Sequence, residues 1–242
     1  MKPISIITVN KNHVSGLKRT IESVLMQTST EYEYIVIDGA SADGSAELKK
    51  EYPQIDRFIS EPDSGIYNAM NKGIKLAHGM YCLFLNSGDM LFHKDVLTDV
   101  IKKLNECGGV TDILSCRLML PGNDSYFPRK NYDILHFQPG CIPHQATLIR
   151  RELFKEIGFY REDYRLISDF IFFFKALCLK KVRFQTADIP FCSYEMNGLS
   201  TDRELIDQEV SRYLTEREVP FRYRLIMAAR KLRTRLTGGS HG

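Results

Sequence analysis

Three aspartates stand where a carboxylate can do chemistry, at the ends of two expected strands and at the start of an expected helix: Asp38, Asp89 and Asp169. Asp38 ends the apolar run Tyr34–Ile37 and is followed by Gly39, so we expect its carboxylate at the carboxyl end of a strand. A carboxylate only accepts hydrogen bonds, which suits the ring N–H of uracil, thymine or guanine, whereas cytosine lacks that hydrogen. The alternative is an Asx-turn that only closes the loop.

Asp89 and Asp169 indicate two further roles. Asp89 follows Leu83–Leu85 in the sequence Leu-Asn-Ser-Gly-Asp. Mg²⁺ commonly takes one or two carboxylates together with substrate phosphates, so Asp89 is a candidate metal ligand, and the alternative is a turn or helix cap. Asp169 precedes the mostly apolar stretch Phe170–Leu177. A carboxylate there is either an N-terminal cap or a partly desolvated general base.

His144 lies in the segment Ile-Pro-His-Gln and has three interpretations: it binds a phosphate, orients an acceptor, or satisfies a hydrogen bond in the core. The other histidines do not stand at zinc-ligand spacing, which disfavours a zinc site. The sequence also lacks the phosphate loop of P-loop enzymes, the dinucleotide-binding glycines, the zinc-protease helix and the hydrolase elbow.

Short apolar runs alternate with helical periodicity through the first ninety residues. We expect strands at residues 4–9, 34–37, 57–60 and 80–85, and helices at 14–26, 46–51 and 64–77, the last capped by Ser64. This alternation predicts an α/β fold with a single, mostly parallel central sheet flanked by helices. Ligands bind at the carboxyl ends of such strands, where the polar clusters 8–12, 38–41, 61–64 and 86–89 fall.

The second half is less regular. We expect strands near residues 113–116, 146–149 and 182–189, a helix from about Arg151, an apolar helix capped by Ser168, and a polar loop at 197–201. Neither a repeat nor a low-complexity linker divides the chain, so we predict one domain over residues 1–216 and a tail over 217–242.

Composition excludes several protein classes. The chain has 242 residues, of which 43% are hydrophobic, and a net charge of +3. No apolar run reaches the ~20 residues that span a bilayer, and the N-terminus lacks the features of a signal peptide. Its six cysteines are widely spread, which predicts reduced thiols in a cytoplasmic protein.

The tail is basic and is predicted to form an amphipathic helix. Residues 217–235 hold seven basic side chains against the single acid Glu218. Phe221, Leu225, Ala229, Leu232 and Leu236 follow helical spacing and share one face. Such a helix fits an anionic membrane surface on the inner face of the cell membrane. The alternatives are packing on the protein's own body or on a second copy of the chain; nucleic acid is disfavoured as a partner.

Four segments, taken together and in order, resemble the family 2 glycosyltransferases of the GT-A (nucleotide-diphospho-sugar transferase) fold: Ile4–Val9, Val36–Ser45, Ser60–Ile74 and Leu83–Asp89. The similarity extends over about residues 4–200 and is greatest to bacterial enzymes of capsule, colanic-acid-like and O-antigen assembly. It implies a nucleotide-sugar donor, a divalent cation (Mn²⁺ or Mg²⁺) and inversion of the anomeric centre in a single displacement.

The resemblance also implies roles for individual residues. On the donor side, residues around the base and ribose would be Thr8, Val9, Asn10 and Asp38, with Asp63 and Asn71 along the cleft. Asp89 would hold the metal and Asp169 would be the catalytic base. On the acceptor side, His144 and Gln145 match a Pro-His-Gln segment of the family. The family loop that closes over the donor is matched by Asn197, Gly198 and Ser200.

Two departures from the family pattern bear on function. The paired acids before the metal ligand are replaced by Asn86-Ser-Gly, and the Gln-x-x-Arg-Trp motif of processive synthases is missing from a chain without tryptophan. The missing motif predicts a non-processive enzyme that adds one sugar per acceptor. Our overall hypothesis is transfer of one hexose from a UDP-sugar to a lipid-linked saccharide or polysaccharide. The alternative is a nucleotide-sugar-binding scaffold or regulatory subunit with weak or lost turnover.

Overall fold

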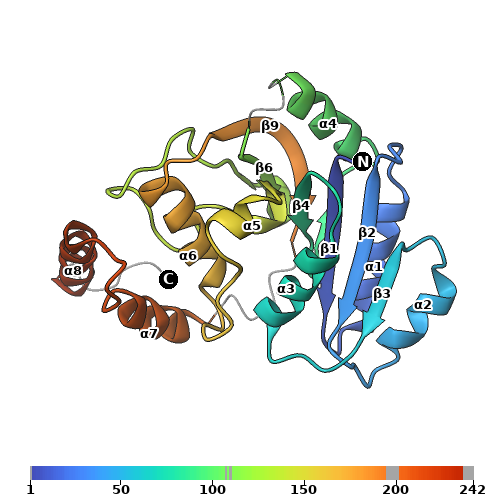
Figure 1. Ribbon diagram of the computed structural model, residues 1–242, viewed down its shortest axis with the longest axis horizontal. Coiled ribbons are helices and arrows are strands. Elements are labelled where there is room, and N and C mark those ends of the chain that lie inside the picture. The colour runs from blue at the N-terminus through green and yellow to red at the C-terminus, as the bar shows by residue number, and fades with distance from the viewer. Residues whose placement is uncertain (1, 107, 109–110, 195–201, 237–242) are drawn as a thin grey trace.

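The computed structural model describes residues 2–106, 108, 111–194 and 202–236. One mixed sheet runs through the molecule (Figure 1). Its strands are β1 (Ile4–Asn10), β2 (Tyr32–Asp38), β3 (Arg57–Ser60), β4 (Tyr81–Phe84), β5 (Met90–Leu91), β6 (Ile113–Met119), β7 (Ser125–Tyr126), β8 (Thr147–Arg150) and β9 (Phe184–Ser193). The helices are α1 (Val14–Leu25), α2 (Leu48–Glu51), α3 (Ile66–Leu76), α4 (Val96–Glu106), α5 (Leu153–Glu156), α6 (Ser168–Phe174), α7 (Arg203–Tyr213) and α8 (Phe221–Leu236).

The strand order is β3-β2-β1-β4-β8-β6-β9-β5, and β7 pairs with β6. The first four strands are parallel, as the β-α alternation predicts. Strand β8 then joins β4 in antiparallel orientation, and β6 and β9 continue the sheet as a parallel pair. The predicted α/β architecture is confirmed, and the sheet becomes mixed beyond β4.

Alternation along the central strands builds a core on each face of the sheet, because successive side chains of a strand point to opposite faces. Ile7 of β1 packs in the cluster that contains α3 and α6. Ile6, its neighbour, packs in the cluster that contains α1 and α4. The parallel strands are thus covered on both sides, and their carboxyl ends remain as the edge that carries the polar loops.

Two predicted caps are wrong. The residue before α3 is Gly65, with φ 134°, and no side chain caps that helix. Helix α6 begins at Ser168 itself. The Ser168 hydroxyl instead accepts a hydrogen bond from the backbone N–H of Arg161, a contact that local sequence does not reveal.

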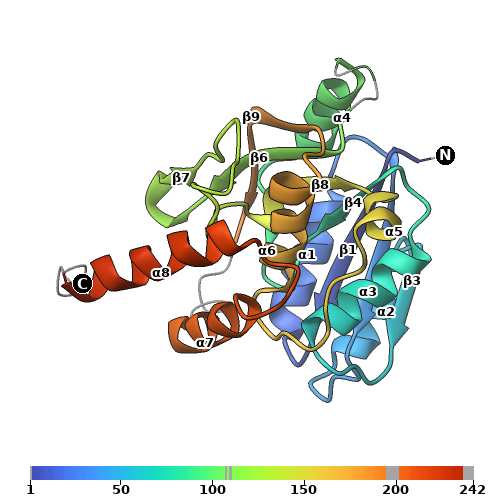
Figure 2. The same cartoon turned by 60° about the vertical axis from the view of Figure 1, so that its left-hand side comes forward.

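The C-terminal helix α8 packs on the body through the face opposite to the predicted apolar stripe. Tyr223 is fully buried, and its ring centroid lies 4.4 Å from that of Phe174. Phe221 and Leu225 of the stripe are 72% and 56% exposed. In Figure 2 the helix extends outward beside α7, away from the parallel strands. Val219 and Tyr223 belong to the main core, so the chain beyond residue 216 continues the packed body.

Among the described residues, the helices lack the combination of length and apolar character that crossing a membrane requires. The described cysteines are free thiols, as predicted: Cys82, Cys116, Cys141, Cys178 and Cys192.

Candidate active site

The loop after β2 is built around the carboxylate of Asp38. Its Oδ1 accepts from Asn10 Nδ2 at 2.7 Å and from the Ser41 hydroxyl at 2.5 Å. Its Oδ2 accepts from the Ser41 backbone N–H at 3.0 Å and from the Ser60 hydroxyl at 2.6 Å. These donors outweigh burial and lower the pKa of Asp38. The contact of Asp38 with a base stays a prediction; in the structure all its acceptor capacity holds the β1, β2 and β3 ends together.

Gly39 lets this loop approach the next one. A Cβ on Gly39 would lie 2.2 Å from Asp63 Oδ2, a distance that real Cβ contacts do not reach. Asp63 Oδ1 accepts from the backbone N–H of Gly65 at 3.0 Å and so orders the start of α3. The predicted donor-side residues Asp38 and Asp63 therefore lie in adjoining loops.

The loop after β4 carries Asp89 and is positioned by α1. The Asp89 carboxylate accepts from the backbone N–H of Asn86 at 3.0 Å, closing a tight turn. Thr20 of α1 donates to the Asn86 carbonyl at 3.3 Å and accepts from the Gly88 N–H at 2.9 Å. Gly88 adopts φ 104°, a left-handed conformation that favours glycine. Asp89 is only 4% exposed, so its carboxylate is held at a defined place.

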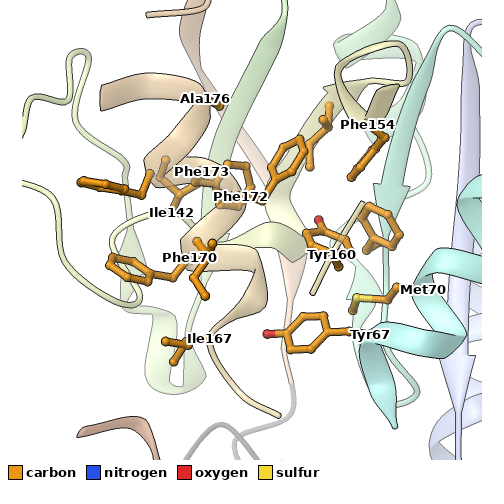
Figure 3. Close-up of a cluster of buried hydrophobic side chains, with 14 of the residues drawn as sticks. Tyr67, Met70, Ile142, Phe154, Tyr160, Ile167, Phe170, Phe172, Phe173 and Ala176 are labelled. Carbon is orange, nitrogen blue, oxygen red and sulfur yellow. The ribbon is translucent and has the colours of Figure 1, made fainter. Parts of the chain in front are cut away.

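Asp169 at the start of α6 lies at the centre of a hydrogen-bonded group. Its Oδ1 accepts from the Tyr67 hydroxyl at 2.9 Å and from the backbone N–H of Phe170 at 2.8 Å. Its Oδ2 lies 2.9 Å from Nδ1 of His144. Figure 3 shows Tyr67 projecting from α3 towards the start of α6. Residues 102 positions apart in the chain thus meet at this carboxylate.

His144 links Asp169 to the loop of Asp89. Because a carboxylate only accepts, Nδ1 of His144 must carry the proton that faces Asp169. The opposite ring nitrogen, Nε2, lies 3.2 Å from Asn86 Nδ2. The hydrogen-bonded series Asp169, His144, Asn86, Asp89 therefore joins the predicted catalytic base to the predicted metal ligand.

The charges of this series are coupled. Burial alone would lower the pKa of His144, but its hydrogen bond and charge interaction with Asp169, and the charge of Asp89, raise it. Burial alone would raise the pKa of Asp169, and the same His144 contact, with Tyr67, lowers it instead. The side chains of His144 and Asp169 are 18% and 19% exposed, so this pair is reachable from solvent and only weakly screened. Asp169 is thus kept ionised, as a proton acceptor must be.

The residues around Asp89 fit a hard cation that also binds substrate phosphates. Asn86 Oδ1 is buried without a hydrogen-bond partner, which leaves an oxygen ligand next to the Asp89 turn. Within the described part of the chain, His, Cys, Asp and Glu do not form a cluster of three around a common metal position. One carboxylate and one amide oxygen suit Mg²⁺ or Mn²⁺ only if phosphate oxygens and waters complete the coordination.

The other predicted residues differ in their surroundings. Thr8 is fully buried and its hydroxyl lies 3.1 Å from that of Tyr34, inside the core. Val9 is buried, and its carbonyl accepts from the Ser87 N–H at 3.1 Å. Asn10 joins the Asp38 and Ser87 loops, because its Oδ1 also accepts from the Ser87 hydroxyl at 2.7 Å. Thr8 and Val9 thus lie inside the core as part of β1 and position the loops at its carboxyl end.

Asn71 is also structural in its contacts. Its Nδ2 donates to the Tyr160 carbonyl at 2.8 Å and to Glu162 at 2.9 Å, while its Oδ1 accepts from the Tyr160 N–H at 3.1 Å. Gln145 is half-buried and its carbonyl accepts from the Cys192 thiol at 3.2 Å. The predicted donor-closing residues lie outside the described residues: Asn197, Gly198 and Ser200.

Sequence reasoning missed two tyrosines beside the carboxylate of the predicted base, Asp169. Tyr67 donates to Asp169, and Tyr160 is buried with its ring centroid 5.5 Å from that of Tyr67. The signal for Tyr67 was available, because it shares the inner face of α3 with Met70 and Ile74 at helical spacing. Nothing in the local sequence marks Tyr160.

Comparisons with known proteins identify the family of the chain. The model of the family described as Glycosyl transferase family 2 matches residues 5–182. A PGL/p-HBAD biosynthesis glycosyltransferase of Mycobacterium bovis is 30% identical over 215 residues, which cover 87% of this chain and 83% of that protein.

Two solved structures share the fold. S. aureus TarS 1-349 in complex with UDP-GlcNAc has a TM-score of 0.70 at 18% identity, covering 98% of this chain and 74% of that one. The chain spans 44% of a longer TarS structure. Mannosyltransferase PcManGT from Pyrobaculum calidifontis, in complex with GDP-Man and Mn²⁺, has a TM-score of 0.69 at 16% identity. The match covers 94% of this chain and 68% of that one. At these identities the likeness concerns the fold alone.

Proposed function

The chain belongs to glycosyl transferase family 2, and we propose that it is an inverting, non-processive hexosyltransferase that uses a UDP-sugar donor. The observation that carries the proposal is the hydrogen-bonded series from Asp169 through His144 and Asn86 to Asp89. It brings an ionised carboxylate and an oxygen-rich turn to the same edge of the sheet. Inverting transfer needs these two elements side by side, a base for the acceptor and a place for the leaving diphosphate.

In the proposed reaction Asp169 takes the proton of an acceptor hydroxyl. The acceptor oxygen forms a bond to the anomeric carbon, and the bond from that carbon to the diphosphate oxygen breaks. The nucleoside diphosphate leaves with the electron pair. His144 and Tyr67 hold the two carboxylate oxygens of Asp169 so that its free lone pair faces the acceptor.

A divalent cation would be held by Asp89, together with the unpartnered Oδ1 of Asn86 and the donor's phosphates. When bound, such a cation supplies positive charge that offsets the negative charge of the departing diphosphate. The Mn²⁺ in the PcManGT complex supports this assignment by analogy of fold.

The donor and acceptor classes rest on similarity and on chemistry. UDP-GlcNAc in the TarS complex supports a UDP-sugar. The mycobacterial relative is named for PGL/p-HBAD biosynthesis, and this supports a place in the assembly of cell-envelope glycoconjugates, with a lipid-linked saccharide or polysaccharide as acceptor. We place this reaction in the cytoplasm, on the inner face of the cell membrane.

The test of activity is release of UDP and transfer of sugar by the purified protein. A panel of UDP-sugars, with GDP-mannose for contrast, is incubated with Mn²⁺ and a lipid-linked saccharide mixture. We expect UDP release with at least one UDP-sugar and its loss on chelation with EDTA. Tight UDP-sugar binding without release of UDP would instead identify the chain as a binding scaffold.

Membrane contact is proposed to run through the exposed face of α8. Phe221 and Leu225 point away from the body, and the neighbouring Arg222 is exposed. Arg224 and Arg230 already donate to backbone carbonyls of the protein, at Val219 and Phe137 among others, so they contribute less to lipid binding than their number suggests. We therefore propose that insertion of the Phe221 and Leu225 side chains into the lipid contributes most of the membrane affinity.

Vesicle co-sedimentation at low salt tests the membrane proposal. The double variant Phe221→Asp with Leu225→Asp should lose most binding to vesicles that contain phosphatidylglycerol. Phe92→Asp is the matched control, since Phe92 is 47% exposed in the segment between β5 and α4, and it should bind like the wild type. Equal binding by the double variant and the wild type would remove the membrane surface as a partner.

A further inference from the structure

A pocket of about 280 Å³ lies beside the base, between the start of α3, the segment that precedes α6, and the start of α7. Its lining includes Tyr67, Asn68, Glu162, Arg165, Leu166 and Leu205. Tyr67 is the connection to the chemistry, because the residue that lines the pocket also donates its hydroxyl hydrogen to Asp169. The lining also includes Ser64 and Gly65, which directly follow the predicted donor-side residue Asp63, so the pocket adjoins the donor edge without taking residues from the loops of Asp38 or Asp89.

The lining of the pocket is chemically mixed. Leu166 and Leu205 are half-buried and present apolar surface. Glu162 accepts from Asn68 at 2.8 Å and keeps further acceptor capacity. The guanidinium of Arg165 is exposed, and neither a hydrogen bond nor an ion pair joins it to another described residue, while its backbone N–H donates to Glu209. The pocket therefore offers apolar surface, the carboxylate of Glu162 and the guanidinium of Arg165, which has five N–H donors, within one small volume.

The balance of charges points to a neutral ligand. Two carboxylates, those of Glu162 and Asp202, stand against the single cation of Arg165, so a phosphate or other anion would be repelled on balance. A saccharide ring has apolar C–H faces and hydroxyls that both donate and accept, and it matches every part of this lining. Ligand pockets typically measure roughly 300–1,000 Å³, and this one, at about 280 Å³, lies just below that range, as suits a single sugar unit.

We propose that this pocket is the acceptor subsite, which binds the terminal sugar of the acceptor and presents its hydroxyl to Asp169. This inference rests on the proposed glycosyl transfer and adds the place where the acceptor binds. Arg165 and Glu162 hydrogen-bond the hydroxyls of the acceptor sugar, and Leu166 and Leu205 contact its apolar face. Tyr67 lines this subsite and, through its hydroxyl, holds the carboxylate of Asp169 in place.

Binding of simple glycosides, followed by the backbone amide signals of isotopically labelled protein, tests the subsite. The probes are the methyl glycosides of glucose, galactose, mannose, rhamnose and N-acetylglucosamine, and inorganic phosphate. We expect at least one glycoside to shift the amides of residues 65–68 and Leu205 saturably. Arg165→Ala should weaken this binding at least about tenfold, because a hydrogen bond to a charged group contributes about 1.5–3 kcal/mol and each 1.4 kcal/mol is about a factor of ten.

Two further variants make the test decisive. Leu205→Trp should fill the pocket and abolish binding of the glycoside, because Leu205 lines the pocket and its backbone hydrogen bond to Asp202 does not need the leucine side chain. Arg57→Ala is the matched control, since Arg57 is an exposed arginine of β3 that is not among the residues lining this pocket. It should leave the glycoside affinity unchanged. Unchanged unfolding temperatures establish that each variant is folded.

The proposal is overturned if no glycoside of the panel shifts these amides, if phosphate alone does so, or if either pocket variant binds like the wild type. The proposed glycosyl transfer is measured separately, as metal-dependent UDP release by the wild-type protein. UDP release with a silent pocket would refute only the subsite. Glycoside binding without UDP release would leave a sugar-binding pocket and refute the transfer reaction.

Discussion

Replacing Asp169 with Asn removes the proposed proton acceptor and leaves most of its surroundings intact. The Asn side chain has the same shape, so its Oδ1 can accept from the Tyr67 hydroxyl and the Phe170 N–H, which lie 2.9 and 2.8 Å from the carboxylate oxygen. Its Nδ2 replaces Oδ2 opposite His144, where it can donate to Nδ1 once the ring proton has moved to Nε2 and the Asn86 amide has turned its Oδ1 towards that nitrogen. The variant should therefore fold.

The magnitudes of the two effects differ. Exchanging a charge-assisted hydrogen bond for a neutral one lowers the free energy of unfolding by about 1–2 kcal/mol. Loss of a general base lowers the rate by about 10²- to 10⁴-fold, which corresponds to about 3–5 kcal/mol in the activation free energy. Because Asp169 does not contact the proposed nucleotide loops directly, the affinity for UDP should stay the same.

The assay compares kcat for sugar transfer, UDP affinity by calorimetry and stability by urea denaturation in the same preparations. Asp188→Asn is the matched control, because Asp188 pairs with Arg117 and its side chain is 68% exposed. It should leave all three quantities near their wild-type values. A kcat for Asp169→Asn within about threefold of wild type, far from the loss expected for a base, would refute the assignment of Asp169.

Three further outcomes follow from the structure. Asp89→Ala should abolish the stimulation of UDP release by Mn²⁺, and a wild-type Mn²⁺ titration curve would remove Asp89 as the ligand. Asn71→Ala should lower the free energy of unfolding by about 2–4 kcal/mol, because it leaves buried backbone groups without partners, while the UDP affinity measured by calorimetry stays constant. His144→Gln should move the acidic limb of the pH–rate profile to higher pH, because the pKa of Asp169 is held low by His144 and activity falls as that carboxylate is protonated.

Stability should also depend on pH through Glu33. Burial would raise its pKa, but the Ser5 hydroxyl and the backbone N–H groups of His78 and Gly79 lower it below 4.5. The unfolded chain therefore binds a proton at Glu33 more readily than the folded chain does. The stabilisation of the fold by ionised Glu33 is thus present above pH 4.5 and is lost as the pH falls through the folded-state pKa. Urea denaturation of Glu33→Gln should show a flatter loss of stability in acid, and an unchanged slope would contradict the linkage.

Much of this architecture was predictable because it depends on local pattern. Short β-branched runs such as Ile4–Val9 form buried strands, and helical spacing between such runs predicts parallel crossovers. Parallel strands bring their carboxyl ends to one edge, so the loops of Asp38 and Asp89 had to be neighbours. The family resemblance added Asp169 to that edge, and it is the structure that joins Asp169 to the loop of Asp89, through His144 and Asn86.

Other features depend on contacts between distant parts of the chain, which local pattern does not encode. Tyr67 and Asp169 are separated by 102 positions and meet only because α3 and α6 pack on the same face of the sheet. Helix α8 has an apolar stripe that periodicity identifies, yet it packs through Tyr223, since a close, tilted ring contact with Phe174 is available on that side. Spacing along a chain determines which residues share a face, and only the packed partners decide which face is buried.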